Sequence, residues 1–399
     1  MLTMGRILEA QRSLASFLQP SALVPAPGLA EGVEVYLKAE NLQKTGSFKV
    51  RGASFRIAQL TPEEKKRGVI ACSAGNHAQG VALAAQREGI RCIICMPEAA
   101  PLSKVERTRA YGAEVILCPG VYDDCYQQAL ALQEEHGYIF VHPFDDEDVI
   151  AGQGTVALEI LNQLPHPDAV IVPAGGGGLI TGMSYVFKQL HPACRVIGVE
   201  AAGAASMKNS VEHGRVMTLD SVATIADGIA VKRPGERAVA QCRTTVDEWV
   251  TVSESEIASA ILTLLEDHKM VAEGAGAVSV AAVMHGKVNL YGKRTVCVVS
   301  GGNVDVNLIG RIISKGLYTT GRVVDIETTL DDRPNQLRGL LDVLSRAGAN
   351  ILSVSHDRET SHVELGSCVV RVRLETRGRE HVPQVLAELN AHGYIVRHW

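Results

Sequence analysis

Lys49 lies between Phe48 and Val50, in an apolar setting that is unusual for a lysine. Because lysines are mostly exposed, Lys49 taken alone is interpreted as a surface charge. Burial among apolar neighbours, however, lowers the pKa of an amine and makes it a nucleophile that can form a Schiff base. Residues elsewhere in the chain decide between these two interpretations.

Four consecutive glycines, Gly175–Gly178, follow the apolar run Ala169–Pro173 and precede a helical segment that starts near Leu179. Glycines allow backbone N–H groups to turn toward an anion, and the positive end of the following helix adds to the attraction. A plain flexible turn is the alternative, but it rarely needs four glycines between a strand and a helix. The run matches neither the dinucleotide fingerprint nor the P-loop. We therefore expect a phosphate-binding turn.

Two further segments end apolar, strand-like runs. In Ser73–Gly80, turn N–H groups could hold a carboxylate and the Asn76 amide could bond a phenolate-like oxygen. Equally, Ser73 could simply cap the helix and leave Asn76 in solvent. Ser300 ends the run that starts at Thr295 and is followed by Gly-Gly-Asn. A phosphate site, a lysine, an asparagine and a strand-end serine together match the needs of pyridoxal 5′-phosphate (PLP): partners for phosphate, aldehyde, ring oxygen and ring nitrogen.

The elements that must position these residues alternate between apolar strand-like runs and helical segments from about residue 34 to 316. This alternation predicts an α/β fold with parallel sheets, in which ligands lie at the carboxyl ends of the strands. Beyond a linker at residues 316–321 the pattern changes to strand-helix-strand-strand-helix-strand, the split βαβ order. The expected closing strand begins at Tyr394.

Composition excludes several classes of protein. A net charge of −5 gives no basic field for nucleic acid or anionic lipid. The nine cysteines are an odd number in scattered positions, and those in apolar runs are expected to be buried free thiols of a reducing compartment. Cys92 and Cys95 have the spacing of a metal or redox pair, but the two apolar residues between them favour burial. No signal peptide or membrane span is recognised, so the cytoplasm is expected.

Four motifs occur in an order that resembles a known family: the segment Glu40–Ala53, then SAGNHAQG from Ser73, GGGGL from Gly175 and VSGGN from Val299. Over about residues 5–320 the chain is similar to the threonine dehydratases (threonine ammonia-lyases), which are fold-type II PLP enzymes related to the tryptophan synthase β chain. The C-terminal segment resembles an ACT module, an α+β (ferredoxin-like) regulatory unit. The resemblance implies a PLP-dependent catalytic domain at 1–320, with a smaller subdomain at about 48–150, and an ACT domain at 322–399.

The resemblance also implies roles for individual residues. The enzyme would remove water and ammonia from L-threonine or L-serine, giving 2-oxobutanoate or pyruvate. Lys49 would hold PLP as a Schiff base and take the Cα proton of the substrate. Around the cofactor would lie Phe48 beside the ring, Asn76 at the ring oxygen, Gly175, Gly176, Gly177, Gly178 and Leu179 at the phosphate and Ser300 at the ring nitrogen, while Ser73, Gly75, Asn76 and His77 would surround the substrate carboxylate.

Two departures from the related serine racemases narrow this expectation. The racemases carry a serine at the position of Ala74, and that serine protonates the opposite face of Cα. Alanine has no proton to give, so elimination should dominate over racemisation. The racemases also bind a divalent cation at positions that correspond here to Glu200, Ala204 and Ser206. Because serine replaces an aspartate there, the site loses a charge and its affinity for a divalent cation should fall, so a monovalent ion or no ion is expected as readily as Mg²⁺.

Two more acidic positions allow two interpretations each. Glu273 could face the active site or serve as an acid at a helix N-terminus. Asp227-Gly228 could line the cofactor, where glycine permits a close backbone approach, or form a plain turn.

Other functions and partners remain open at this point. The alternatives are a hydroxyaspartate lyase, a serine racemase or a threonine synthase of the same fold, or a non-catalytic amino-acid sensor, against which the intact Lys49 argues. An amino-acid or nucleotide effector is expected at the ACT module. Because ACT modules usually pair across subunits, a homodimer or homotetramer is expected. The chain could serve isoleucine biosynthesis or threonine catabolism.

Overall fold

The computed structural model describes residues 2–359 and 364–399. The chain forms two compact units that divide between Asp305 and Val306. The expected change near residue 320 falls at the end of α13 (Val306–Thr319), before the first strand of the second unit. The linker expected at residues 316–321 was partly wrong, because residues 316–319 are the helical end of α13.

The larger sheet of the first unit has six strands in the order β1-β2-β10-β7-β8-β9. All neighbouring strands are parallel except β1 and β2, which pair antiparallel. The central strands β7 and β10 are almost entirely buried, as expected for strands covered on both faces. The strands are β1 (Leu23–Pro25), β2 (Glu34–Ala39), β7 (Ala169–Pro173), β8 (Arg195–Ala201), β9 (Glu248–Val252) and β10 (Arg294–Val299).

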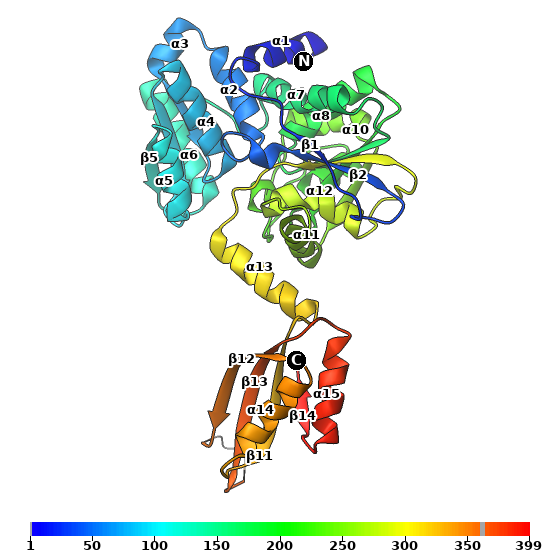
Figure 1. The fold of residues 1–399 in the computed structure, drawn as a ribbon. Coiled ribbons are helices and arrows are strands. Elements are labelled where there is room, and N and C mark those ends of the chain that lie inside the picture. Colours follow the sequence, from blue (N-terminus) through cyan, green and yellow to red (C-terminus); the bar gives the residue numbers. More distant parts are fainter. Residues whose placement is uncertain (1, 360–363) are drawn as a thin grey trace. The chain divides into compact units, whose positions relative to one another are not determined.

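Helices cover both faces of this sheet (Figure 1). On one face α7 packs against α1 and α8, and α8 packs against α10. On the other face α12 contacts β10, β7 and β8, and α11 packs on α12. The helices are α1 (Met4–Leu14), α7 (Glu147–Gln163), α8 (Gly178–Leu190), α9 (Ser206–His213), α10 (Glu236–Thr245), α11 (Glu254–Glu266) and α12 (Gly274–Met284), with single turns at η1 (Glu40–Leu42), η2 (Ala202–Ala204) and η3 (Asp227–Ile229).

A smaller, all-parallel sheet of the same unit has the order β5-β4-β3-β6. Helix α2 packs against both α4 of this subdomain and α7 of the larger one. These elements are α2 (Lys49–Ala58), α3 (Pro62–Arg67), β3 (Val69–Cys72), α4 (Asn76–Glu88), β4 (Cys92–Pro97), α5 (Leu102–Ala110), β5 (Glu114–Cys118), α6 (Tyr122–His136) and β6 (Ile139–Phe140).

The second unit has the strand and helix order expected for an ACT-like module. Its antiparallel sheet has the order β12-β13-β11-β14, and α14 and α15 contribute to the apolar core on one face. The closing strand begins at Val396 rather than at Tyr394, because Tyr394 packs against the core instead of pairing. After α13 come β11 (Val323–Asp331), α14 (Gln336–Arg346), β12 (Asn350–Asp357), β13 (Ser367–Glu375), α15 (His381–Ala391) and β14 (Val396–His398).

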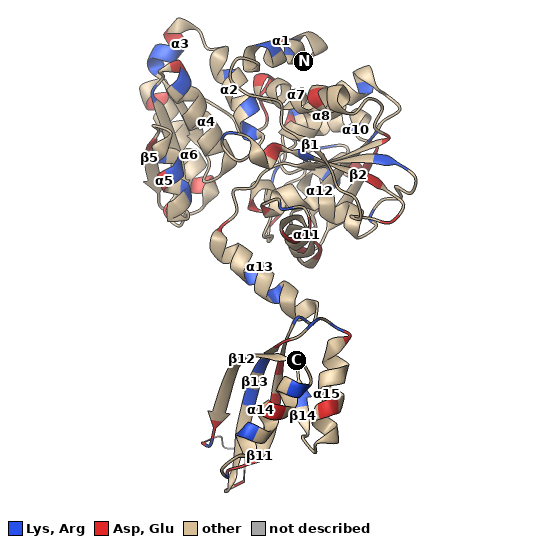
Figure 2. Cartoon of the chain, in the orientation of Figure 1, with Lys and Arg blue, Asp and Glu red and all other residues tan. Residues whose placement is uncertain are grey.

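Charged residues of both signs are interspersed along the chain, for example on α3 (Figure 2). All nine cysteines are free and buried, as expected for thiols in apolar runs. Among the described residues, no helix has the length and apolarity needed to cross a membrane.

Candidate functional site

A cavity of about 1080 Å³ lies in the first unit, where junctions that follow β3, β6, β7 and β10 meet. Parallel sheets bring the carboxyl ends of their strands to one edge, which explains why distant motifs converge there. Every site residue expected from the sequence lines this cavity. These residues are Phe48, Lys49, Ser73, Gly75, Asn76, His77, Gly175, Gly176, Gly177, Gly178, Leu179 and Ser300.

Lys49 begins α2, and backbone pairing holds the preceding segment against the end of β10. The Phe48 N–H donates to the Ser300 carbonyl at 3.1 Å, Ser47 pairs with Gly301, and the Gly302 N–H donates to the Gly46 carbonyl at 2.9 Å. Two motifs about 250 residues apart in the sequence are thereby fixed to each other. This pairing places Lys49 and Ser300 on the wall of the same cavity.

The Lys49 amine donates to the Pro143 carbonyl at 2.8 Å. Burial lowers the pKa of Lys49 to about 8, and the nearby Glu273 carboxylate opposes this change. An amine with this pKa is unprotonated in about a tenth of molecules at pH 7, a few hundred times the fraction for an ordinary lysine of pKa about 10.4. It can therefore act as a nucleophile or as a base.

Gly175–Gly178 form the turn between β7 and α8. Gly177 has a φ of +94°, which favours glycine, and a Cβ on Gly176 would lie 2.2 Å from the Phe144 ring. Within the described part of the chain, the backbone N–H groups of residues 175–179 donate to no protein acceptor. Five free donors at the start of a helix suit an anion with several oxygens.

The start of α4 offers a second set of N–H groups. Gly75 is the N-cap, and the Ser73 hydroxyl accepts from the Gly75 N–H at 3.2 Å rather than from the helix itself. The alternative in which Ser73 caps the helix is therefore wrong, because Ser73 lies two residues before the N-cap position, which Gly75 occupies. The N–H groups of Asn76 and His77 have no acceptor among the described residues. They remain available to a carboxylate.

The Asn76 side chain is fixed by two hydrogen bonds rather than left in solvent. Its amide donates to the Glu273 carboxylate at 2.6 Å, and its oxygen accepts from the Asn303 amide at 2.6 Å. Asn303 also donates to the Thr45 carbonyl at 2.7 Å. Sequence reasoning assigned no role to Asn303, although it belongs to the Val299–Asn303 motif, which was the available signal.

Glu273 is the N-cap residue of α12, yet its side chain makes no cap hydrogen bond and instead lines the cavity. Burial, with a smaller contribution from Asp227, raises the pKa of Glu273 to about 7. A Cβ on Gly301 would lie 2.3 Å from the Glu273 carboxylate, so a larger residue there would have to displace that carboxylate. Of the two interpretations of Glu273, the one facing the cavity is confirmed.

The imidazole ring of His77 is buried and stays neutral, although histidine is often an acid or base in active sites. The residue is 3% exposed, and its Nε2 lies 2.8 Å from the Val141 carbonyl oxygen. Burial, together with the charge of Lys49, lowers the pKa of His77 to about 3, so the ring stays neutral. Any contact with a ligand would therefore use its backbone N–H.

The remaining expected residues are also placed by the structure. Ser300 is buried, and its hydroxyl donates to the Ala275 carbonyl at 3.3 Å. Asp227 and Gly228 line the cavity, and Asp227 forms an ion pair with Lys104 of α5.

Glu200, which corresponds to a cation ligand of the racemases, does not line this cavity. Its two oxygens accept from the N–H groups of residues 207 and 208 at 2.9 and 2.7 Å, at the start of α9.

Comparison with known proteins gives consistent results. Residues 14–301 match the family model described as "Pyridoxal-phosphate dependent enzyme". An L-threonine ammonia-lyase of Thermotoga maritima is 52% identical over 100% of this chain and 99% of its own length. Among solved structures, a processed threonine deaminase of Solanum lycopersicum is 38% identical (TM-score 0.74; 78% of this chain, 87% of that one). A maize serine racemase is 34% identical (TM-score 0.75; 80% and 98%).

Proposed function

Since the chain belongs to the pyridoxal-phosphate dependent enzyme family, we propose that it is an L-threonine ammonia-lyase that also accepts L-serine. The products are 2-oxobutanoate or pyruvate, with ammonia. The observation that carries this proposal is the convergence of Lys49, the Gly175–Leu179 N–H groups and the α4 N-terminus on one cavity. The relatives named as threonine ammonia-lyase and threonine deaminase support the choice of substrate.

The residues present fit PLP. Five free N–H groups at the start of α8 suit its phosphate, and Lys49 provides an amine for its aldehyde. Asn76 would bond the ring oxygen, Ser300 the ring nitrogen, and Phe48 would pack beside the ring. Once bound, PLP supplies the electron sink that makes the Cα proton of an amino acid acidic.

The protein's own groups would then bind and deprotonate the substrate. The free N–H groups of Asn76 and His77 would hold the substrate carboxylate, together with Ser73 and Gly75. Lys49, with its lowered pKa, would take the Cα proton. The β-hydroxyl leaves as water, and hydrolysis of the resulting enamine-type product releases ammonia and the 2-oxo acid.

Ala74 argues for elimination over racemisation. It lines the cavity, and its methyl group has no proton to deliver to the second face of Cα. We therefore expect release of 2-oxobutanoate from L-threonine with little D-serine from L-serine. Equal or faster turnover of 3-hydroxyaspartate would instead favour a hydroxyaspartate lyase.

The C-terminal unit would serve as a regulatory ACT module that binds an amino-acid or nucleotide effector. We further propose a homodimer or homotetramer, supported by two exposed apolar residues on β12, Leu352 (49% exposed) and Val354 (40%). Nine buried free thiols support a cytoplasmic location.

The experiment that tests the proposed function supplies the purified protein with PLP and L-threonine and measures 2-oxobutanoate. Lys49→Ala should lower kcat by at least about 10²–10⁴-fold, the range typical for loss of a general base. Lys66→Ala, at an exposed lysine of α3, is the matched control and should leave kcat unchanged. Absence of 2-oxobutanoate from the wild-type protein, or full activity of Lys49→Ala, would contradict the proposal.

A further inference from the structure

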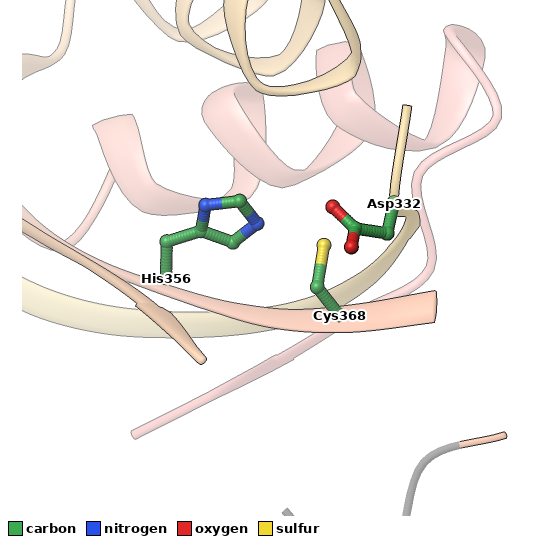
Figure 3. Close-up of side chains that lie close together, drawn as sticks. All are labelled: Asp332, His356 and Cys368. Carbon is green, nitrogen blue, oxygen red and sulfur yellow. The ribbon is translucent and has the colours of Figure 1, made fainter. Parts of the chain in front are cut away.

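A group of three chemically different side chains gathers at one end of the sheet in the second unit. Asp332 follows β11, His356 lies near the end of β12 and Cys368 lies near the start of β13. Their ligand atoms all lie within 4.8 Å of one another. Figure 3 shows the three side chains pointing toward a common point.

Strand register explains this convergence. Cys368 pairs with Leu330, and His356 pairs with Val370. Side chains two residues apart on a strand point to the same face, so Cys368 and Val370 share a face with their partners Leu330 and His356, and Asp332 lies directly after the end of β11. The antiparallel pairing therefore assembles the group from three separate segments.

We propose that Asp332, His356 and Cys368 form a binding site for one Zn²⁺ ion. Thiolate sulfur, imidazole nitrogen and carboxylate oxygen are the three ligand types that zinc prefers, at about 2.0–2.3 Å from the metal. Atoms within 4.8 Å of one another can all be reached by a single ion with small side-chain rotations. Within residues 2–359 and 364–399, no other group of three or more histidine, cysteine or acidic side chains meets this spacing.

A cavity of about 230 Å³ adjoins the group and leaves room for a fourth ligand. It is lined by all three residues and also by Pro334, Leu337 and Arg358. Since a water molecule occupies about 30 Å³, the cavity can hold the water that would complete a tetrahedral site.

The contacts seen without metal show what must change when zinc binds. The Arg358 Nε donates to both oxygens of Asp332 at 2.9 Å, and the Cys368 thiol donates to the Leu330 carbonyl at 3.5 Å. Zinc would replace the guanidinium as the partner of the carboxylate. The thiol would lose its proton to solvent as the sulfur–zinc bond forms. The Arg358 side chain is 59% exposed, so it can move into solvent.

The test uses the full-length protein with PLP, stripped of metal with a chelator and dialysed against buffered Zn²⁺. The number of zinc ions bound per chain is measured by inductively coupled plasma mass spectrometry. The wild-type chain should retain one zinc with high affinity. Mutation of residues that only hydrogen-bond to zinc ligands typically lowers zinc affinity by about 10–100-fold. Loss of a direct ligand in His356→Ala or Cys368→Ser should therefore lower zinc affinity by about 100-fold or more. Arg358→Ala removes the competing cation and should bind zinc more tightly.

Matched controls exclude zinc held elsewhere. His392→Ala removes another histidine of the same unit, and Cys194→Ser removes a buried thiol that also donates to a carbonyl. Both should bind zinc as the wild type does. If Cys368→Ser fails to fold, His356→Ala decides the matter, because it leaves the core unchanged. Wild-type zinc affinity in His356→Ala, or no zinc retained by the wild type at micromolar concentrations, would overturn the proposal.

Discussion

Lys49 and Glu273 each influence the protonation of the other. Burial lowers the pKa of Lys49 to about 8, and the negative charge of Glu273 keeps it from falling further. Burial raises the pKa of Glu273 to about 7, and Asn76 and Lys49 oppose that rise. Above pH 7 the carboxylate is ionised and the amine is losing its proton. This is the range in which an amine becomes reactive toward an aldehyde.

The rate at which the apoenzyme takes up PLP should therefore depend on pH. Only the neutral amine attacks the aldehyde, so the rate should rise about tenfold per pH unit below pH 8 and level off above it. Stopped-flow absorbance of the bound cofactor measures this rate. A midpoint near the ordinary lysine pKa of about 10.4 would show that burial does not lower the pKa of Lys49.

Glu273→Gln provides the matched comparison. Removing the carboxylate removes the interaction that raises the pKa of Lys49, so the midpoint of PLP uptake should move to lower pH. Glutamine keeps the size of the side chain and can still accept a hydrogen bond from Asn76. A midpoint that moves to higher pH would show that Glu273 does not act on Lys49 through its charge.

Among the elements, the turn that starts α8 requires glycine at residue 177 both for its backbone conformation and for its close packing against α10. Gly177 has a φ of +94°, and a Cβ there would lie 2.4 Å from the Ala238 Cβ of α10. Gly177→Ala should lower the free energy of unfolding by about 2–4 kcal/mol through backbone strain and overpacking. It should also weaken PLP binding, because the free N–H groups of the turn would move. Urea unfolding and PLP titration measure these effects.

Gly286→Ala separates strain from overpacking. Gly286 also has positive φ, at +60°, but nothing lies within 4 Å of its added Cβ. It should cost only about 1–2 kcal/mol and leave PLP affinity unchanged. Equal losses of stability and PLP affinity in the two variants would show that packing against α10 is unimportant.

A buried ion-pair network holds the start of α2 to neighbouring elements. Arg51, two residues after Lys49, binds both oxygens of Glu40 at 2.7 and 2.8 Å and also contacts Glu159 of α7 at 2.6 Å. Lys38 of β2 binds Glu159 at 2.7 Å. Two positive and two negative charges thus balance one another where water is excluded, which links α2 to both η1 and α7.

Arg51→Met should lower the free energy of unfolding by about 3–5 kcal/mol, because it leaves buried carboxylates without their partner. Arg91 makes a similar two-bond contact with Glu114 on the surface, where each side chain is 57% exposed. Arg91→Met should leave unfolding nearly unchanged, since exposed ion pairs contribute little. Denaturant midpoints of the two variants provide the comparison, and similar losses in both would contradict the assignment of Arg51.

For the whole molecule, much could be predicted from the sequence. Continuous apolar runs predicted buried parallel strands, and the pattern beyond residue 321 predicted the order of strands and helices in the second unit. The convergence of the motifs followed from the geometry of parallel sheets. Three features could not be predicted. The antiparallel β1 is only three residues long. The hydrogen bonds of Asn76 join it to residues about 200 positions away in the sequence. The last turn of α13 contains Gly316 and Thr319, which suggested a linker.

The proposed regulation is tested on the full chain. Addition of L-isoleucine, L-valine or a nucleotide should change the KM for L-threonine through at least one of these compounds, since effector binding and substrate binding are reciprocally linked. Initial rates over a range of substrate concentrations measure this change in KM.

The proposed oligomeric state is tested by light scattering, which should give the mass of a dimer or tetramer of the 42.6 kDa chain. A monomer whose kinetics respond to none of these compounds would argue against a regulatory ACT module.

The most direct measurement locates the attachment of PLP. The purified holoenzyme is treated with borohydride, which reduces a Schiff base to a stable amine, and is then digested and analysed by mass spectrometry. We expect a phosphopyridoxyl group on Lys49 alone, and its loss in Lys49→Ala. The same group on another lysine, or on none, would contradict the assignment of Lys49 as the residue that holds the cofactor.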